Sequence, residues 1–126
     1  MKRIVLFICP FVEKKERPEY EKEVKRKVLR EDLKISLKFV YPETNEFILN
    51  IWLLIKKEKL KIVVFHKCHA STITDHHKAL SKKEGAGGMF FFHNDTYGVL
   101  DEQLRNKVVQ LNTLKFLPSQ LATMVG

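Results

Sequence analysis

The sequence predicts an α/β fold with three layers, in which helices cover both faces of a mostly parallel sheet of four to five strands. Two patterns favour this class. Short apolar runs rich in β-branched residues, typical of strands buried on both faces, alternate with longer segments whose apolar residues recur every three or four positions. This alternation is typical of parallel sheets, because each helix returns the chain to the same edge of the sheet.

Chain length and composition predict a single folded domain spanning residues 1–126. Hydrophobic residues make up 44% and charged residues 30%, a balance that argues against disorder. The longest apolar stretch, Phe47 to Ile55, is shorter than the roughly 20 residues that cross a bilayer, so we expect no membrane span. The first apolar run lacks a small-residue cleavage site, which favours an intracellular, cytoplasmic protein over a secreted one.

The first half of the chain predicts two strands and two helices. Residues 3–9 form an apolar first strand. Pro18 suits the first turn of a helix whose narrow apolar stripe begins at Tyr20. Alternating residues over 34–41 predict a second strand with one wetter face, as at the edge of a sheet. The helix expected over 43–59 is apolar almost all round.

The second half predicts two further strands and two further helices. The run over 59–65 reads as a strand buried on both faces, followed by a helix over 72–83. A glycine-rich break, Gly85 to Gly88, precedes a strand over 89–92 and is therefore not a phosphate loop. The apolar spacing over 101–117 predicts a last helix, ended by a proline.

Metal-capable side chains lie where two predicted strands end. His66, Cys68 and His69 follow the strand over 59–65, and Cys9 ends the first strand. Sites in open α/β proteins lie beyond the carboxyl ends of the strands, and thiolate with imidazole suits Zn²⁺. Cys9, His66, Cys68 and His69 are therefore candidate zinc ligands, with an open position for hydration or hydrolysis. In an extended chain His66 and Cys68 point the same way, and His69 points the other way unless the chain turns there.

Plainer roles remain open for the same side chains. Cys9 and Cys68 fit inert thiols in the core, and a disulfide between them fits a hyperthermophilic source. His66 and His69 fit ordinary polar groups at a strand end. Cys68 with either histidine also fits a nucleophile and base pair. The sequence thus leaves open whether the protein is an enzyme.

The formal net charge of +8 favours a polyanionic partner. The candidate nucleic-acid contacts lie on the first predicted helix and are Lys22, Lys25, Arg26, Lys27 and Arg30. Acidic residues are interleaved with them, which also fits a solvated helix face of mixed sign.

The apolar segment Phe47 to Ile55 predicts either a deeply buried helix or a subunit interface, and thus a possible homodimer. Three functions follow from these patterns. The leading hypothesis is a metal or small-ligand site at the carboxyl ends of the strands. The second is a basic protein that binds nucleic acid without catalysis, and the third is a partner-binding domain without a site.

Parts of the chain resemble β-type carbonic anhydrases. An apolar helix leads into Ile62-Val63-Val64 and a His and Cys pair, and residues 88–100 are similar to that family's last strand and glycine turn. The resemblance implies an α/β fold with zinc held by Cys9 and, through the pair, by His66 and Cys68.

The chain departs from that family at two points. The His66-x-Cys68 pair is one residue shorter than the family spacing, and Cys9 is followed by Pro10-Phe11-Val12-Glu13 where the family has Cys-x-Asp-x-Arg. The acid–base dyad is therefore missing, and the resemblance supports the fold more than the activity. A chain this short and basic also resembles uncharacterised small proteins of archaeal viruses.

Overall fold

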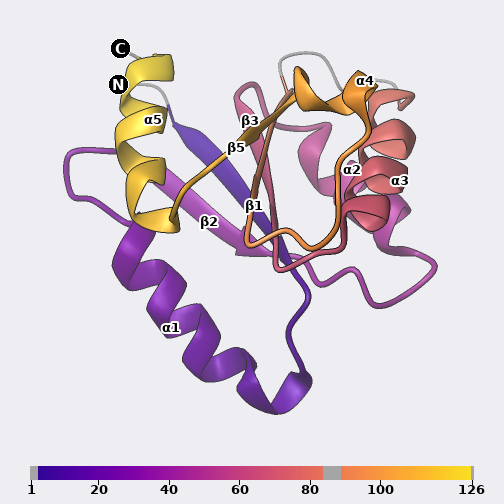
Figure 1. The fold of residues 1–126 in the computed structure, drawn as a ribbon. Helices are drawn as coiled ribbons and strands as arrows, with labels where there is room; N and C mark the ends of the chain where they lie inside the picture. The colour runs from indigo at the N-terminus through magenta and orange to yellow at the C-terminus, as the bar shows by residue number, and fades with distance from the viewer. Residues whose placement is uncertain (1–2, 84–88, 126) are drawn as a thin grey trace.

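The computed structural model describes residues 3–83 and 89–125 and confirms the α/β class. All five strands are parallel and lie in the order β2-β1-β3-β4-β5 (Figure 1). The strands are β1 (Ile4–Pro10), β2 (Ile35–Phe39), β3 (Lys61–His66), β4 (Met89–Asn94) and β5 (Val108–Gln110). The glycine-rich break expected at 85–88 lies outside the described residues.

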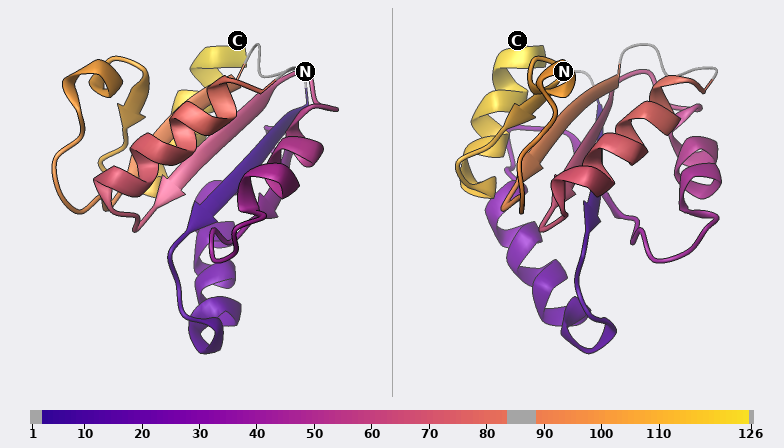
Figure 2. Two further views of the ribbon diagram at one scale, coloured as in Figure 1. Left: turned by 90° about the vertical axis from the view of Figure 1, so that its right-hand side faces the viewer. Right: turned by 45° about the vertical axis from the view of Figure 1, so that its right-hand side comes forward.

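Helices cover both faces of this sheet, as predicted. Two lie on one face, α1 (Arg17–Val28) and α5 (Leu117–Val125), and on the other face lie α2 (Phe47–Ile55), α3 (Ala70–Ser81) and the short α4 (Glu102–Arg105). Figures 1 and 2 show the pair α1 and α5 separated from α2 and α3 by the sheet. Two 3₁₀ turns precede helices, η1 (Lys14–Glu16) and η2 (Leu114–Phe116). The molecule therefore has the three layers that the sequence predicts.

Strand alternation sorts side chains between two apolar cores. In β1 the even-numbered Ile4, Leu6 and Ile8 pack towards α1 and α5, whereas Val5 and Phe7 pack towards α2 and α3. Both central strands, β1 and β3, are buried along their whole length because helices cover both faces. Strand β2 lies at an edge of the sheet, as predicted, but its five residues are all partly buried, so the expected wetter face does not stand out.

The predicted last helix over 101–117 is wrong. This segment instead holds α4, β5 and η2, and Pro118 lies in the first turn of α5, where its missing N–H costs nothing. The apolar stripe divides between the two cores: Leu104 and Val108 pack on the α2 and α3 side, and Leu111 and Leu114 on the α1 side. The buried residues have helical spacing here because the segment passes around the edge of the sheet from one core to the other, not because it forms one helix.

The strand order creates a switch point beside β1. From β1 the chain passes to β2 on one side, and later to β3 on the other side. The helices that follow these two strands, α1 after β1 and α3 after β3, lie on opposite faces of the sheet, so the loops after β1 and β3 diverge and leave a crevice at the carboxyl ends of the two strands.

Helix α2 buries Phe47, Ile51 and Ile55 against the sheet and exposes Leu49 and Leu53 to solvent. The core therefore covers one face of this apolar helix and leaves part of its apolar surface in contact with solvent. Of the helices in the described ranges, none is long and apolar enough to cross a membrane.

Candidate functional site

A cleft of about 700 Å³ lies at the switch point, between α1 and the carboxyl ends of β3 and β4. We call it the switch-point cleft. Its polar walls come from the loop before α1, from α1, and from the ends of β3, β4 and β5. Its cationic side chains are Lys15, Lys27 and Lys67, its anionic ones are Glu16, Glu19, Glu23 and Asp95, and its neutral polar ones include Tyr20, His66, Asn94, Asn112 and Thr113. Four chain segments distant in sequence therefore share one concave surface.

His66 lies at the centre of a hydrogen-bonded chain in this cleft. Its imidazole Nδ1 lies 2.6 Å from the Tyr20 hydroxyl, and its Nε2 lies 3.1 Å from the Asp95 carboxylate. A carboxylate can only accept, so Nε2 carries the hydrogen and Nδ1 accepts from the phenol. The resulting order, Tyr20 to His66 to Asp95, fixes the tautomer and the orientation of a histidine that is only 5% exposed.

Burial sets the protonation of this chain. Desolvation lowers the pKa of His66, and the Asp95 carboxylate opposes that shift only in part. Desolvation also raises the pKa of the Tyr20 phenol, helped by the nearby Tyr41 and the cysteines. At neutral pH both rings are therefore uncharged, and the polar chain ends at a carboxylate that faces solvent.

Local sequence explains how the three groups meet. Pro18 starts α1, and Tyr20 lies in its first turns, facing the end of β3. Asp95 directly follows β4 and adopts φ 53°, a left-handed conformation that Asp tolerates better than most residues. Asn94, one residue earlier, fixes the next segment by donating its side-chain amide to the Leu111 carbonyl at 2.7 Å. Strand register places His66 beside Asn94, so the chain segments are held at the correct depth.

A turn at Lys67 separates the predicted zinc ligands. Lys67 has φ 60°, which interrupts the strand alternation after His66. His66 therefore stays on the α1 side, whereas Cys68 crosses to the α2 and α3 side and joins Cys9 in that core. The expectation that His66 and Cys68 point the same way is thus corrected.

The two cysteines lie close together as free thiols. Cys68 Sγ donates to the Cys9 carbonyl oxygen at 3.4 Å. Burial raises the pKa of Cys68 to about 11 and raises the pKa of Cys9 as well. Because the thiolate is the form that binds metal or attacks a substrate, this environment suits structural thiols.

His69 has a structural role at the start of α3. Its Nδ1 accepts from the Ser71 backbone N–H at 3.1 Å, which caps the helix, and Gly98 packs closely against its ring. Across residues 3–83 and 89–125, no three His, Cys, Asp or Glu side chains lie as ligands of one metal ion would. The set Cys9, His66, Cys68 and His69 is therefore divided between two faces and a helix cap, and Zn²⁺ has no fitting group of donors among them.

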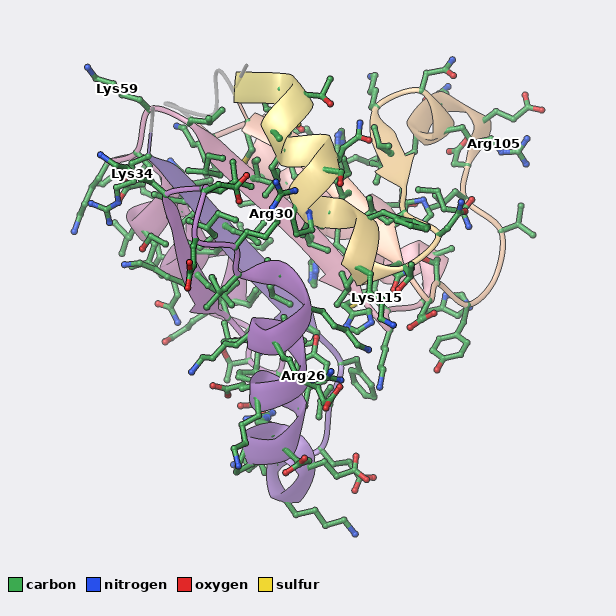
Figure 3. The ribbon with its side chains drawn as sticks, turned by 90° about the vertical axis from the view of Figure 1, so that its left-hand side faces the viewer. Arg26, Arg30, Lys34, Lys59, Arg105 and Lys115 are labelled. Atoms are coloured by element: carbon green, nitrogen blue, oxygen red, sulfur yellow. The ribbon has the colours of Figure 1, made fainter. Side chains whose placement is uncertain are left out.

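The candidate nucleic-acid contacts of the first predicted helix do not form one free basic stripe, and Arg30 lies beyond α1, which ends at Val28. Arg26 pairs with Glu23 at 2.8 Å, and Arg30 pairs with Asp32. Lys27 lines the switch-point cleft, while Lys22 and Lys25 face solvent. Figure 3 shows Arg26 and Arg30 on the α1 side of the molecule, well separated from Lys59.

Sequence reasoning found the correct edge of the sheet but missed two of its polar side chains. Asp95 follows the strand predicted over 89–92, and it reaches this end of the sheet because β4 runs parallel to β3. Tyr20 was read as part of an apolar stripe, and its ring does pack there, against Phe39. Its hydroxyl at the end of the ring is the signal that the stripe interpretation left unused.

Comparisons with family models, curated proteins and solved structures find no match for this chain. The chemistry of the cleft is therefore argued from its own residues.

Proposed function

We propose that the protein binds a small polar ligand in the switch-point cleft, with Tyr20, His66 and Asp95 as its principal polar contacts. One observation carries the proposal: three side chains from α1, β3 and the loop after β4 converge through short hydrogen bonds within a cleft at the switch point. Ligands of doubly wound sheets bind at this position, outside the carboxyl ends of the strands. A cleft of about 700 Å³ is within the size range of small-molecule sites.

The hydrogen-bonded chain gives the cleft a means to exchange a proton with a ligand. A ligand group that hydrogen-bonds to the Tyr20 hydroxyl can transfer a proton through His66, whose charged form the Asp95 carboxylate stabilises. The same logic orients histidine beside a hydroxyl in acid–base sites on unrelated folds. Binding is the proposed function, and proton exchange is the chemistry that the chain adds to it.

A ligand panel tests this proposal. Nucleotides, sugar phosphates, amino acids and dicarboxylates are screened by thermal shift, and the Kd of each hit is measured by calorimetry. Tyr20→Phe should weaken binding of the true ligand by about tenfold, the worth of one well-placed hydrogen bond. Tyr41→Phe is the matched control, because its hydroxyl donates to Glu21 and does not line this cleft. Hits that bind both variants with the Kd of the unsubstituted protein, or a panel without any hit, would contradict the proposal.

A second candidate function is nucleic-acid binding by α1. It is favoured by the exposed side chains of Lys22 and Lys25 on a chain of net charge +8. If α1 contacts phosphates, affinity for single- or double-stranded DNA falls steeply with salt, and Lys22→Gln with Lys25→Gln reduces the salt slope by about 2. The matched control is Lys56→Gln with Lys57→Gln at the end of α2. Equal loss in both double variants would point to diffuse charge and not to α1.

A further inference from the structure

A second hollow of about 280 Å³ lies at the same edge of the sheet, on the other side of Lys67. We call it the aromatic hollow. Two large aromatic side chains line it and are strongly exposed, Phe11 at 72% and Tyr97 at 61%. The rest of its lining comes from Pro42, Lys67, Cys68, His69 and Thr72. Exposed aromatic rings that share one concave surface mark a place where a flat apolar group is bound.

Backbone hydrogen bonds fix both aromatic residues against one loop. The Phe11 N–H donates to the His66 carbonyl at 3.1 Å, and the Tyr97 N–H donates to the Cys68 carbonyl at 3.2 Å. The Tyr97 carbonyl accepts in turn from the Ala70 N–H at 2.7 Å. Their backbones are therefore in place before a ligand arrives, which lowers the entropic cost of binding.

Lys67 lies between the aromatic hollow and the switch-point cleft and lines both. Among the described residues that line the aromatic hollow, none is acidic, so the charge there is positive. Across the cleft, the wall formed by η1 and α1 carries three glutamates, Glu16, Glu19 and Glu23, and two lysines, Lys15 and Lys27. An anionic group is thus attracted to Lys67 but repelled further into the cleft.

We propose that the ligand of this edge is a nucleoside phosphate, whose base lies against Phe11 and Tyr97 and whose phosphate lies at Lys67. The inference rests on the proposed function of the switch-point cleft and names the ligand class. Bases stack on aromatic side chains whatever their sequence, and lysine binds phosphate as a point charge. On the wall opposite Lys67 the three glutamates outnumber the two lysines, which favours one phosphate over three. The same chemistry is presented by a free mononucleotide and by the 5′-phosphorylated end of a single strand.

Calorimetry with adenosine 5′-monophosphate on the full chain tests the inference. Phe11→Ala and Tyr97→Ala should each weaken binding about five- to 150-fold, as expected for loss of one stacked ring. Both side chains are exposed, so the fold is retained. Lys67→Gln should also weaken adenosine monophosphate but leave adenosine unchanged, and adenosine triphosphate should bind no more tightly than the monophosphate.

Control substitutions near the amino ends of the strands separate loss of specific contacts from general effects of removing an aromatic ring or a positive charge. Phe90→Ala removes an exposed aromatic ring near the start of β4, and Lys59→Gln removes a lysine just before β3 (Figure 3). Both should leave the Kd within twofold of the unsubstituted protein. A 5′-phosphorylated oligodeoxyadenylate, compared with the mononucleotide, shows which source is preferred. The inference is overturned if neither ligand binds, or if Phe11→Ala and Tyr97→Ala bind them as the controls do.

The outcome also distinguishes this inference from the proposed function. If a panel ligand binds Tyr20→Phe more weakly, but the Kd of adenosine monophosphate is unchanged in Phe11→Ala and Tyr97→Ala, the cleft is a binding site and the nucleotide inference is wrong. If nucleotide binding needs Phe11 and Tyr97 but is unchanged in Tyr20→Phe, the ligand class holds and the role given to the hydrogen-bonded chain is wrong.

Discussion

The two sides of the carboxyl edge use the same residue types for different purposes. On the α1 side, the His66 ring forms hydrogen bonds with the Tyr20 phenol and the Asp95 carboxylate in an open cleft. On the α2 and α3 side, the equally buried His93 ring forms a hydrogen bond with the Thr96 hydroxyl. Cys9 and Cys68 on that side are thiols in an apolar core. Histidine and cysteine near a strand end therefore do not define a site by themselves. What distinguishes His66 is a carboxylate within hydrogen-bond distance. Open space alone does not, because His93 also lines a hollow, of about 580 Å³.

The largest expected effect lies on the apolar side. Phe65→Ala removes a fully buried ring that stacks on Phe91, so the free energy of unfolding should fall by about 3–5 kcal/mol. Phe90→Ala, on the neighbouring strand but 45% exposed, should cost at most about 1 kcal/mol. Urea unfolding measures both. Equal losses of unfolding free energy in the two variants would show that the core on the α2 and α3 side is not tightly packed around Phe65.

Removing the Tyr20 hydroxyl should have an intermediate effect on stability. Tyr20→Phe leaves the buried Nδ1 of His66 without its donor, which costs about 1–3 kcal/mol. Tyr41→Phe removes a hydroxyl whose partner Glu21 remains accessible to water, so it should cost less than about 1 kcal/mol. The same urea experiment compares them, and a smaller loss for Tyr20→Phe would mean that the His66 chain is not formed in solution.

Stability should decrease as the pH falls below about 6.5, the ordinary pKa of histidine. Burial lowers the pKa of His66 and of His93 in the folded state, so the unfolded chain binds more protons than the folded one in this range. The stabilisation is complete above pH 6.5 and is lost progressively towards the lowered values, by at most about 1.4 kcal/mol per pH unit for each histidine. Urea midpoints at pH 7.5 and 5.5 measure it. His66→Asn should reduce this pH dependence. If the unfolding free energy of the variant changes with pH as steeply as that of the unsubstituted protein, the pKa of His66 is not lowered by burial.

The smallest effect distinguishes the two histidines directly. Asp95→Asn keeps a residue that tolerates a left-handed backbone but removes the charge that supports the protonated form of His66. The pKa of His66 should therefore decrease, while that of His93, which is lowered by burial alone, should not change. A titration of the ring protons by NMR follows both. A shift in both histidines would indicate a general loosening of the edge, and a shift in neither would show that Asp95 is not the partner of His66.

Periodicity was sufficient for most of the fold because the local signals agree with the layers. Apolar runs with β-branched residues became β1 and β3, and Pro18 opened α1 as expected. The segment after residue 101 failed for a physical reason: a stripe of apolar residues reports burial but not which core receives it. There Leu104 and Val108 pack in one core and Leu111 and Leu114 in the other, and Pro118 starts a helix instead of ending one.

The candidate site was predictable in place but not in composition. Parallel strands bring His66 and Asn94 to the same end of the sheet. The sequence predicts a mostly parallel sheet but leaves the direction of the strand before Asn94 open. The left-handed turn at Lys67 could not be predicted from the sequence, because no glycine stands there. This turn places Cys68 on the opposite face of the sheet from His66. Because of this one backbone conformation, the expected zinc ligands lie apart, in a hydrogen-bonded chain on one face and a pair of buried thiols on the other.

Mapping a bound ligand on backbone amides tests the central claim most directly. Isotope-labelled protein is titrated with adenosine 5′-monophosphate, and the amide shifts are assigned along the chain. The largest shifts should fall in the three loops that follow β1, β3 and β4, with Phe11, Lys67 and Tyr97 among them. Shifts confined to the exposed face of α2, or to the amino edge around Lys34 and Lys59, would contradict a ligand site at the switch point.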